Sequence, residues 1–123
     1  MIFHTKQVKG QGRGHAIGFP TINLIIPSNF EMDYGIYAVW VVINDITYKG
    51  AFHYGGVPTF NQNVPSMEVY LLNVTDDTVP NTEDVEIEID IVQYIRAIKT
   101  FDDVEDLMNQ IAQDVEKVNS ILK

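Results

Sequence analysis

The clearest pattern in the chain is an alternation of apolar and acidic residues in its C-terminal half. Apolar side chains at 85, 87, 89 and 91 alternate with acidic side chains at 86, 88 and 90. Because successive side chains of a β-strand point to opposite faces, this run predicts a strand with one buried and one solvated face.

Two other regions of the sequence also predict β-strands. The run IYAVWVVI at 36–43 is rich in β-branched and aromatic residues, and Asn44-Asp45 is a plausible tight turn into a second run at 46–54. This arrangement predicts a hairpin. The run MEVYLLNV at 67–74 predicts a third strand, so that the run at 85–91 becomes the fourth.

The pattern changes period after residue 100. Between 100 and 122, apolar residues recur at spacings of three and four, at Val104, Leu107, Met108, Ile111, Val115, Val118 and Leu122. This spacing predicts one amphipathic helix. Thr100 and Asp103 have the form of a capping box, and Asp102 and Asp103 stand where a helix dipole favours negative charge.

Several short strands followed by one helix indicate a mainly β fold: a small antiparallel barrel or sandwich with the helix on its wall or mouth. A chain of 123 residues with 46% hydrophobic residues fits one domain, over 1–123. It has no cysteine, no apolar run of the roughly 18 residues that a membrane span needs, and no signal-peptide pattern. We therefore expect a soluble, cytoplasmic protein that does not bind membranes.

The distribution of charge adds a constraint on ligands. The net charge of −9 argues against neutralisation of a nucleic-acid backbone. Residues 1–30 contain no Asp or Glu but carry Lys6, Lys9 and Arg13, whereas acidic residues gather after position 75. We therefore expect an anion to be attracted to one end of the chain only.

The stretch GQGRGHAIGFPTINL at 10–24 carries the candidate chemistry. Its glycines allow a loop that points backbone amides at a phosphate. However, they match neither a Walker A loop nor a dinucleotide fingerprint. On the residues alone, a plain glycine-rich turn is therefore the favoured interpretation. Thr21 and Asn23 lie two residues apart, so an extended chain places both side chains on one face. They offer hard oxygen donors of the kind that suits magnesium, although a turn stabilised by the same side chains is favoured on the residues alone.

Five segments taken in order are similar to the riboflavin kinase (flavokinase) family. GRGHAIGFPTINL at 12–24 resembles the family's glycine-rich segment and Pro-Thr-Ala-Asn motif. The similarity continues with YGIYAV at 34–39, GGVPTF at 55–60, MEVYLL at 67–72, and the segment 95–101 that enters the helix. It spans nearly the whole chain and identifies it as a kinase domain like the C-terminal module of bacterial bifunctional riboflavin kinase/FAD synthetases.

The resemblance implies a fold and an activity. The fold is a six-stranded antiparallel Greek-key-like barrel with a C-terminal helix. The activity is transfer of the ATP γ-phosphate to the ribityl 5′-hydroxyl of riboflavin, giving flavin mononucleotide (FMN) and ADP with Mg²⁺. The expected partners are these small molecules, with no nucleic acid, and the expected state is a monomer.

The resemblance also assigns roles to residues. Thr21 and Asn23 would hold Mg²⁺, and Glu68 would take the proton from the attacking hydroxyl. A flap over the phosphates and a second flap beside the isoalloxazine ring would contain the remaining binding residues, which are Gly10, Gly12, Arg13, Gly14, Gly18, Pro20 and Arg96. Arg13 is as well explained as a solvated surface residue.

The alternative interpretation of Glu68 is that it is a solvent-facing residue of a strand without a catalytic role. Alternation places it on the same side as Tyr70 and Leu72, which indicates a partly enclosed setting. An enclosed carboxylate tends to have a raised pKa and can act as a base near neutrality. Trp40 and the strand tyrosines are expected in the core rather than stacked on the flavin.

The chain departs from the family at two places. Residues 76–83, DDTVPNTE, replace the Asp-Leu-Tyr-Gly-like turn that the family has after the glutamate strand. We expect this change to alter the shape of the hairpin at that place and its contacts with the flavin. Ile22 replaces a small residue between Thr21 and Asn23, and its side chain is expected to face away from them. The alternative hypothesis to an active kinase is a non-catalytic flavin- or nucleotide-binding module on the same fold.

Overall fold

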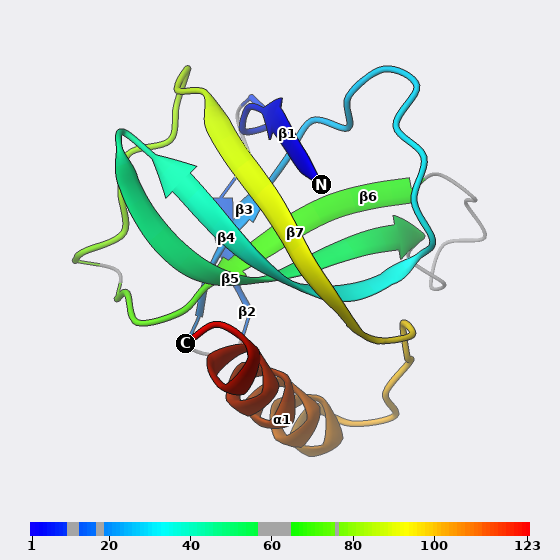
Figure 1. Cartoon of the computed structure of the whole chain (residues 1–123). Helices are drawn as coiled ribbons and strands as arrows, with labels where there is room; N and C mark the ends of the chain where they lie inside the picture. The colour runs from blue at the N-terminus through cyan, green and yellow to red at the C-terminus, as the bar shows by residue number, and fades with distance from the viewer. Residues whose placement is uncertain (10–12, 17–18, 57–64, 76) are drawn as a thin grey trace.

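The computed structural model describes residues 1–9, 13–16, 19–56, 65–75 and 77–123. Strands alternate with loops through most of the chain and a single long helix ends the described part (Figure 1). The elements are β1 (Ile2–Thr5), β2 (Arg13–Ala16), β3 (Phe19–Asn23), β4 (Gly35–Ile43), β5 (Ile46–Gly56), β6 (Pro65–Leu71), β7 (Ile87–Arg96) and α1 (Val104–Ile121).

The seven strands of the described part form one antiparallel sheet in the order β1-β7-β4-β5-β6-β3-β2. The predicted hairpin is confirmed as β4 and β5, with Ile43 opposite Ile46. Asn44 and Asp45 in its turn have φ values of 52° and 67°. Asn and Asp tolerate this left-handed conformation, which two-residue hairpin turns require.

The sheet curls so that the chain just after β1 meets the end of β3 and the residues after it. Beyond β1 and β3 the chain forms an isolated bridge between Gln7 and Leu24, flanked by hydrogen bonds from Val8 N to Asn23 O (2.8 Å) and from Ile25 N to Lys6 O (2.9 Å). Six strands, β1, β7, β4, β5, β6 and β3, therefore make the expected Greek-key-like barrel. Strand β2 is an addition, paired with β3 alone among the described strands.

Apolar side chains fill two separate clusters. The larger lies inside the barrel and contains Val39, Phe52 and Val69, all without exposed surface. The smaller lies between the sheet and α1 and contains Ala38, Ala51, Leu72, Val118 and Leu122, with Trp40 and Tyr70 packed against it. The helix packs on β4, β5 and β7 (Figure 1). The sheet thus has an apolar inner face and an outer face that α1 covers in part.

The structure corrects three details of the predicted elements. The third strand ends at Leu71 rather than at residue 74, because Asn73 adopts a left-handed φ of 61° that turns the chain. The fourth strand starts at Ile87, two residues after the predicted start, and runs on to Arg96. Of the described helices, none is both long and apolar enough to cross a membrane.

The helix is confirmed, but its start and its buried face differ from the prediction. The N-cap is Asp103, whose carboxylate accepts a hydrogen bond from Asp106 N at 2.8 Å, so the predicted capping box with Thr100 is wrong. Val104 and Met108 are 65% and 48% exposed, because the second cluster is built by the later turns around Val118. The predicted apolar stripe is therefore buried at Ile111, Val118 and Leu122 but exposed in the first turns of the helix.

Candidate functional site

Strand β6 separates core residues from candidate functional residues by simple alternation. Met67, Val69 and Leu71 point into the barrel and are fully buried or nearly so. Glu68 and Tyr70 lie on the opposite, helix-facing side of the sheet and are partly buried. The enclosed setting expected for Glu68 is therefore confirmed.

Strand β3 repeats this division beside β6. Ile22 faces the barrel interior with no exposed surface, so its predicted orientation away from Thr21 and Asn23 is confirmed. In the β3–β6 register Thr21 lies opposite Tyr70, and Asn23 lies opposite Glu68. Directly opposed residues of antiparallel strands share a face and have Cβ atoms about 4.5–5.5 Å apart.

These four residues, Thr21, Asn23, Glu68 and Tyr70, form a two-by-two group that we call the polar array. Three of them are the metal and base candidates from the sequence, which the fold brings together from strands more than forty positions apart. The fourth, Tyr70, was not singled out from the sequence. Its one signal was its position two residues after Glu68, on the same face of a strand.

The electrostatics of the array depend on burial. Burial raises the pKa of Glu68 above its ordinary value, and a side-chain hydrogen bond from Tyr70 acts in the opposite direction. Burial and the nearby charge of Glu68 raise the pKa of the Tyr70 phenol far above its usual range. Tyr70 therefore remains protonated at neutral pH.

A row of opposed residues continues from the array across the sheet, with one apolar member, Ile36. Glu68 lies opposite His53 of β5, His53 lies opposite Ile36 of β4, and Ile36 lies opposite Arg96 at the end of β7. Burial and the charge of Arg96 lower the pKa of His53, so this imidazole is neutral at neutral pH. His53, which lies opposite Glu68, is thus an uncharged hydrogen-bond donor or acceptor.

Arg96 joins this row to the helix. Its Nε and Nη2 atoms donate to Oδ1 and Oδ2 of Asp114 at 2.8 and 2.7 Å, and Gln110 Nε2 donates to Oδ1 of Asp114 at 3.1 Å. The side chains of Arg96 and Asp114 are 16% and 4% exposed. The sequence contained a signal for Asp114 but not for its partner, because Asp114 lies three residues after Ile111 and four before Val118, on the predicted apolar stripe.

The glycine-rich stretch only partly matches the predicted loop. Residues 13–16 form strand β2, in which Arg13 lies opposite Ile22 and Gly14 opposite Thr21. Residues 13–16 are thus a strand rather than a loop, because the open edge of β3 supplies hydrogen-bonding partners to this segment. Pro20 is buried in β3, opposite His15.

Some candidate residues fall outside the part of the chain that the structure describes. Gly10, Gly12 and Gly18 are among them, as is the 57–60 part of the GGVPTF motif. Within the described part, no group of three or more His, Asp or Glu side chains is arranged to hold a metal ion. The oxygen donors of Thr21 and Asn23 thus remain the candidates for a metal.

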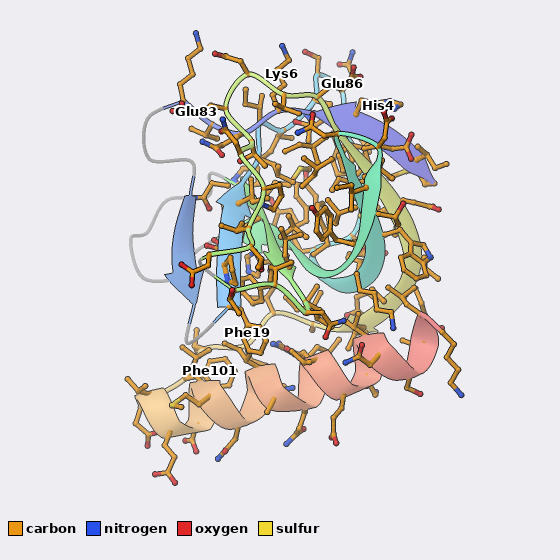
Figure 2. The ribbon with its side chains drawn as sticks, turned by 90° about the vertical axis from the view of Figure 1, so that its left-hand side faces the viewer. His4, Lys6, Phe19, Glu83, Glu86 and Phe101 are labelled. Atoms are coloured by element: carbon orange, nitrogen blue, oxygen red, sulfur yellow. The ribbon has the colours of Figure 1, made fainter. Side chains whose placement is uncertain are left out.

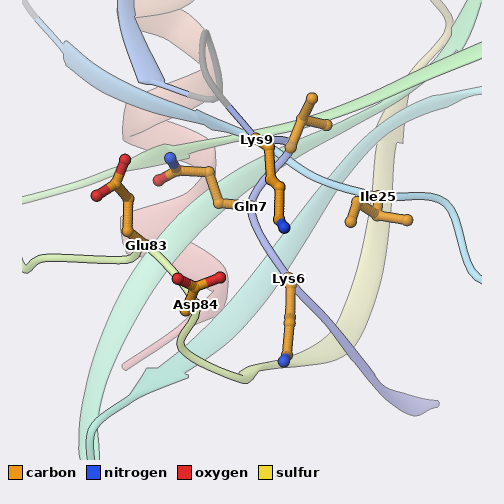
Figure 3. Close-up of a pocket in the computed structure, with 7 residues that line it drawn as sticks. Lys6, Gln7, Lys9, Ile25, Glu83 and Asp84 are labelled. Carbon is orange, nitrogen blue, oxygen red and sulfur yellow. The ribbon is translucent and has the colours of Figure 1, made fainter.

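A separate cleft of about 460 Å³ opens where the chain passes from β1 towards residue 9 (Figure 3). Lys6 and Lys9 line it together with Glu83 and Asp84. Figure 2 shows Lys6 and Glu83 at the end of the barrel away from α1. The fold thus places acidic residues of the later chain beside two of the three basic residues of the first thirty, which the sequence alone did not predict. A buried hydrogen bond from the Thr82 hydroxyl to the Gln7 side chain links the two walls.

Comparison with known proteins gives one consistent family. A family model described as "Flavokinase: Riboflavin kinase" matches residues 1–122. The chain is 31% identical over 111 residues to the bifunctional riboflavin kinase/FMN adenylyltransferase of Bacillus subtilis (strain 168), covering 87% of the chain and 34% of that protein. For the protein of the same description from Buchnera aphidicola subsp. Acyrthosiphon pisum, identity is 32% over 111 residues, covering 88% of the chain and 34% of that protein.

Two further similarities carry other descriptions. The RNA-binding riboflavin kinase RibR of Bacillus subtilis (strain 168) is 30% identical over 109 residues, which is 88% of the chain and 45% of that protein. A crystal structure of a macrolide-efflux protein from Streptococcus pneumoniae superposes with a TM-score of 0.76 and 26% identity, covering 96% of the chain and 38% of that chain. The chain thus spans less than half the length of each of these proteins.

Proposed function

Since this chain belongs to the riboflavin kinase family, we propose that it transfers the γ-phosphate of ATP to the ribityl 5′-hydroxyl of riboflavin, giving FMN and ADP. The observation that carries the proposal is the β3–β6 register, in which Asn23 lies opposite Glu68 and Thr21 opposite Tyr70. Phosphoryl transfer depends mainly on positioning and on charge stabilisation. The register gathers a base and two oxygen donors at one place on the sheet.

Glu68 is the proposed general base. Its carboxylate accepts the proton of the 5′-hydroxyl as that oxygen bonds to the γ-phosphorus, and the bond from phosphorus to the bridging oxygen breaks, so that ADP leaves with the electron pair. Partial burial supports this role, since it raises the pKa of Glu68 and makes the carboxylate a stronger proton acceptor.

Thr21 and Asn23 fit Mg²⁺ by the chemistry of their donors. A hydroxyl and an amide oxygen are hard ligands, and they stand on the same face of β3 beside the base. When bound, Mg²⁺ would neutralise charge on the β- and γ-phosphate oxygens of ATP. The two side chains would hold the ion on the helix-facing side of the sheet, next to Glu68.

The other proposed binding residues flank this array. Gly14, opposite Thr21, and Pro20 belong to the β2–β3 pair, which with Gly10, Gly12, Arg13 and Gly18 would cover the phosphates. The segment from Arg96 into α1 would lie beside the isoalloxazine ring. Arg96 itself is held by Asp114, so its contribution is to fix this segment on the sheet.

The test is direct formation of FMN. The protein is incubated with riboflavin, ATP and Mg²⁺, and FMN is followed by chromatography, with a parallel reaction that contains a chelator in excess over Mg²⁺. We expect FMN in the first reaction and none above background in the second. Binding of riboflavin or ADP without any FMN would contradict the kinase and favour a non-catalytic flavin- or nucleotide-binding module.

Nucleic acid is not part of the proposed function. The net charge of −9 disfavours contacts with a phosphate backbone. The RNA-binding relative is more than twice as long as the part that this chain matches, so its described binding need not belong to the shared region. A gel-shift assay with the relative as positive control tests this, and retention of RNA by this chain would contradict the proposal.

A further inference from the structure

Asn23, Glu68 and His53 form a row across three neighbouring strands of the sheet. Asn23 of β3 lies opposite Glu68 of β6, and Glu68 lies opposite His53 of β5. Directly opposed residues of antiparallel strands share a face, with Cβ atoms about 4.5–5.5 Å apart, so all three side chains stand on the same side of the sheet. A proposed metal ligand and His53 therefore flank the proposed base.

The geometry of phosphoryl transfer assigns the two flanks of Glu68 to different ligands. The attacking and leaving oxygens lie roughly in line through the transferred phosphorus, so donor and acceptor stand on opposite sides of it. With Mg²⁺ and the ATP phosphates on the Asn23 side, the acceptor hydroxyl lies at Glu68 and the rest of the acceptor extends away from β3. The next strand in that direction is β5.

His53 is the β5 residue that is open to such an acceptor. Ala51, two residues before it, lies opposite Tyr70 and is only 2% exposed, because it belongs to the apolar cluster under α1. Gly55, two residues after it, is buried, and the Ile98 side chain occupies the space into which a side chain at position 55 would project. His53 lies between these covered positions and is itself partly exposed. The fold thus leaves an accessible imidazole beside the base.

We propose that His53 is a substrate-binding residue, whose imidazole forms a hydrogen bond with a ribityl hydroxyl next to the 5′-hydroxyl that Glu68 deprotonates. This inference rests on the proposed function and adds a contact that selects the polyol part of the acceptor. A neutral imidazole presents one donor and one acceptor, and a hydroxyl can both donate and accept, so the two groups are complementary. Burial and the nearby Arg96 keep the ring uncharged at neutral pH.

The enclosure of His53 makes the contact selective. A ribityl hydroxyl that enters a half-buried position gives up water and needs a partner in the protein. The isoalloxazine ring makes no such demand on His53, because its proposed place is farther from the base, beside the segment that follows Arg96. Loss of the imidazole should therefore weaken binding of a flavin that carries the ribityl chain and spare a flavin that lacks it.

The experiment compares riboflavin with lumiflavin, which carries a methyl group in place of the ribityl chain. The quenching of flavin fluorescence is titrated with protein in the presence of ADP and Mg²⁺. For His53→Phe we expect the Kd for riboflavin to rise roughly tenfold or more, and the Kd for lumiflavin to change less than about twofold. In turnover, the KM for riboflavin should rise while the KM for ATP stays within about twofold of native. His53→Gln, which keeps a donor and an acceptor, should recover part of the affinity.

His4→Phe is the matched control. His4 is an exposed residue of β1 that pairs with Glu88 at 3.2 Å, and β7 and β4 lie between β1 and β5. We expect native Kd values for both flavins in this variant. An unchanged riboflavin Kd in His53→Phe would overturn the inference, and so would an equal loss of affinity for riboflavin and lumiflavin.

A further measurement uses the native protein alone, in case His53→Phe does not fold. We expect a nuclear Overhauser contact between the His53 ring protons and the ribityl protons of bound riboflavin, and a riboflavin complex without that contact would overturn the inference. The binding measurements need no turnover. Absence of FMN would therefore overturn the proposed kinase, whereas a loss in His53→Phe that is specific for riboflavin would still support the contact.

Discussion

The two faces of strand β6 differ sharply in burial and in chemistry. Met67, Val69 and Leu71 on the inner face have almost no exposed surface and pack with apolar residues only. Glu68 and Tyr70 on the outer face are polar and lie opposite Asn23 and Thr21 of β3. One strand therefore supplies both the packing that fixes its position and the groups proposed to act on substrate.

The difference shows how a small barrel can place chemical groups accurately. The inner side chains determine the register of β6 against β3, because a slip by one residue would turn Val69 and Ile22 out of the core. The same register sets Glu68 opposite Asn23. The positions of the outer side chains are thus a consequence of the packing on the inner face, so changes on the two faces should have separable effects.

The largest effect on stability is expected from the inner face. Leu71→Ala removes a fully buried side chain and should lower the free energy of unfolding by about 2–5 kcal/mol. The rate of FMN formation per folded molecule should change little, because Leu71 faces away from the array. Denaturant unfolding measures the first quantity, and kinetics below the unfolding transition measure the second. A variant with native stability would contradict the burial that underlies this comparison.

A smaller effect is expected where the outer face meets the helix. Asp114→Ala leaves the Arg96 guanidinium without its carboxylate partner and should cost about 3 kcal/mol, at the low end for a buried pair because Arg96 keeps some exposure. Replacing both residues, as Arg96→Met with Asp114→Leu, should recover most of that loss. Denaturant unfolding of the three proteins tests this. Equal stability of Asp114→Ala and the native protein would show that the pair does not anchor the helix.

The smallest effect concerns the dependence of stability on pH. The folded-state pKa of Glu68 is raised above its unfolded value, so the folded protein binds this proton more tightly. Burial of the ionised carboxylate lowers the free energy of unfolding. This loss is complete above the folded-state pKa of Glu68, shrinks as pH falls through that pKa, and is absent below the unfolded-state pKa. Glu68→Gln should therefore melt slightly higher than the native protein at neutral pH, with the difference vanishing in acid.

Thermal melts of Glu68→Gln over a pH series measure this difference. Glu86→Gln provides a matched control, since Glu86 is an exposed glutamate outside the strands that carry the array. A Glu68→Gln variant that is less stable than the native protein at neutral pH would mean that the carboxylate makes stronger interactions than burial and Tyr70 account for.

Local patterns in the sequence predicted the long elements well. The β4–β5 hairpin followed from its β-branched runs and from Asn44-Asp45, whose left-handed conformations the structure confirms. The alternation at 85–91 and the helical period after 100 also located β7 and α1. The start of α1 was misplaced, because Thr100 and Asp103 both have side chains that can cap a helix and the structure uses Asp103.

The arrangement of distant strands was beyond local patterns. Strand β2 contains Gly14 and has no apolar alternation, and its pairing depends on the free edge of β3. The opposition of Asn23 and Glu68, and the pairing of Arg96 with Asp114, depend on connections between segments far apart in the chain. The resemblance to the riboflavin kinase family named three members of the polar array, whereas the position of Tyr70 beside them became visible only in the folded register.

The central claim is that Glu68, on the outer face of β6, acts as the base while the inner face holds it in place. Single-turnover formation of FMN by Glu68→Gln, compared with the native protein and with Glu86→Gln, tests it most directly. We predict a rate about 10²–10⁴-fold below the native rate for Glu68→Gln, with riboflavin binding and thermal stability retained, and a native rate for Glu86→Gln. A Glu68→Gln rate within about threefold of the native rate would contradict the claim, because general-base catalysis contributes far more than that factor.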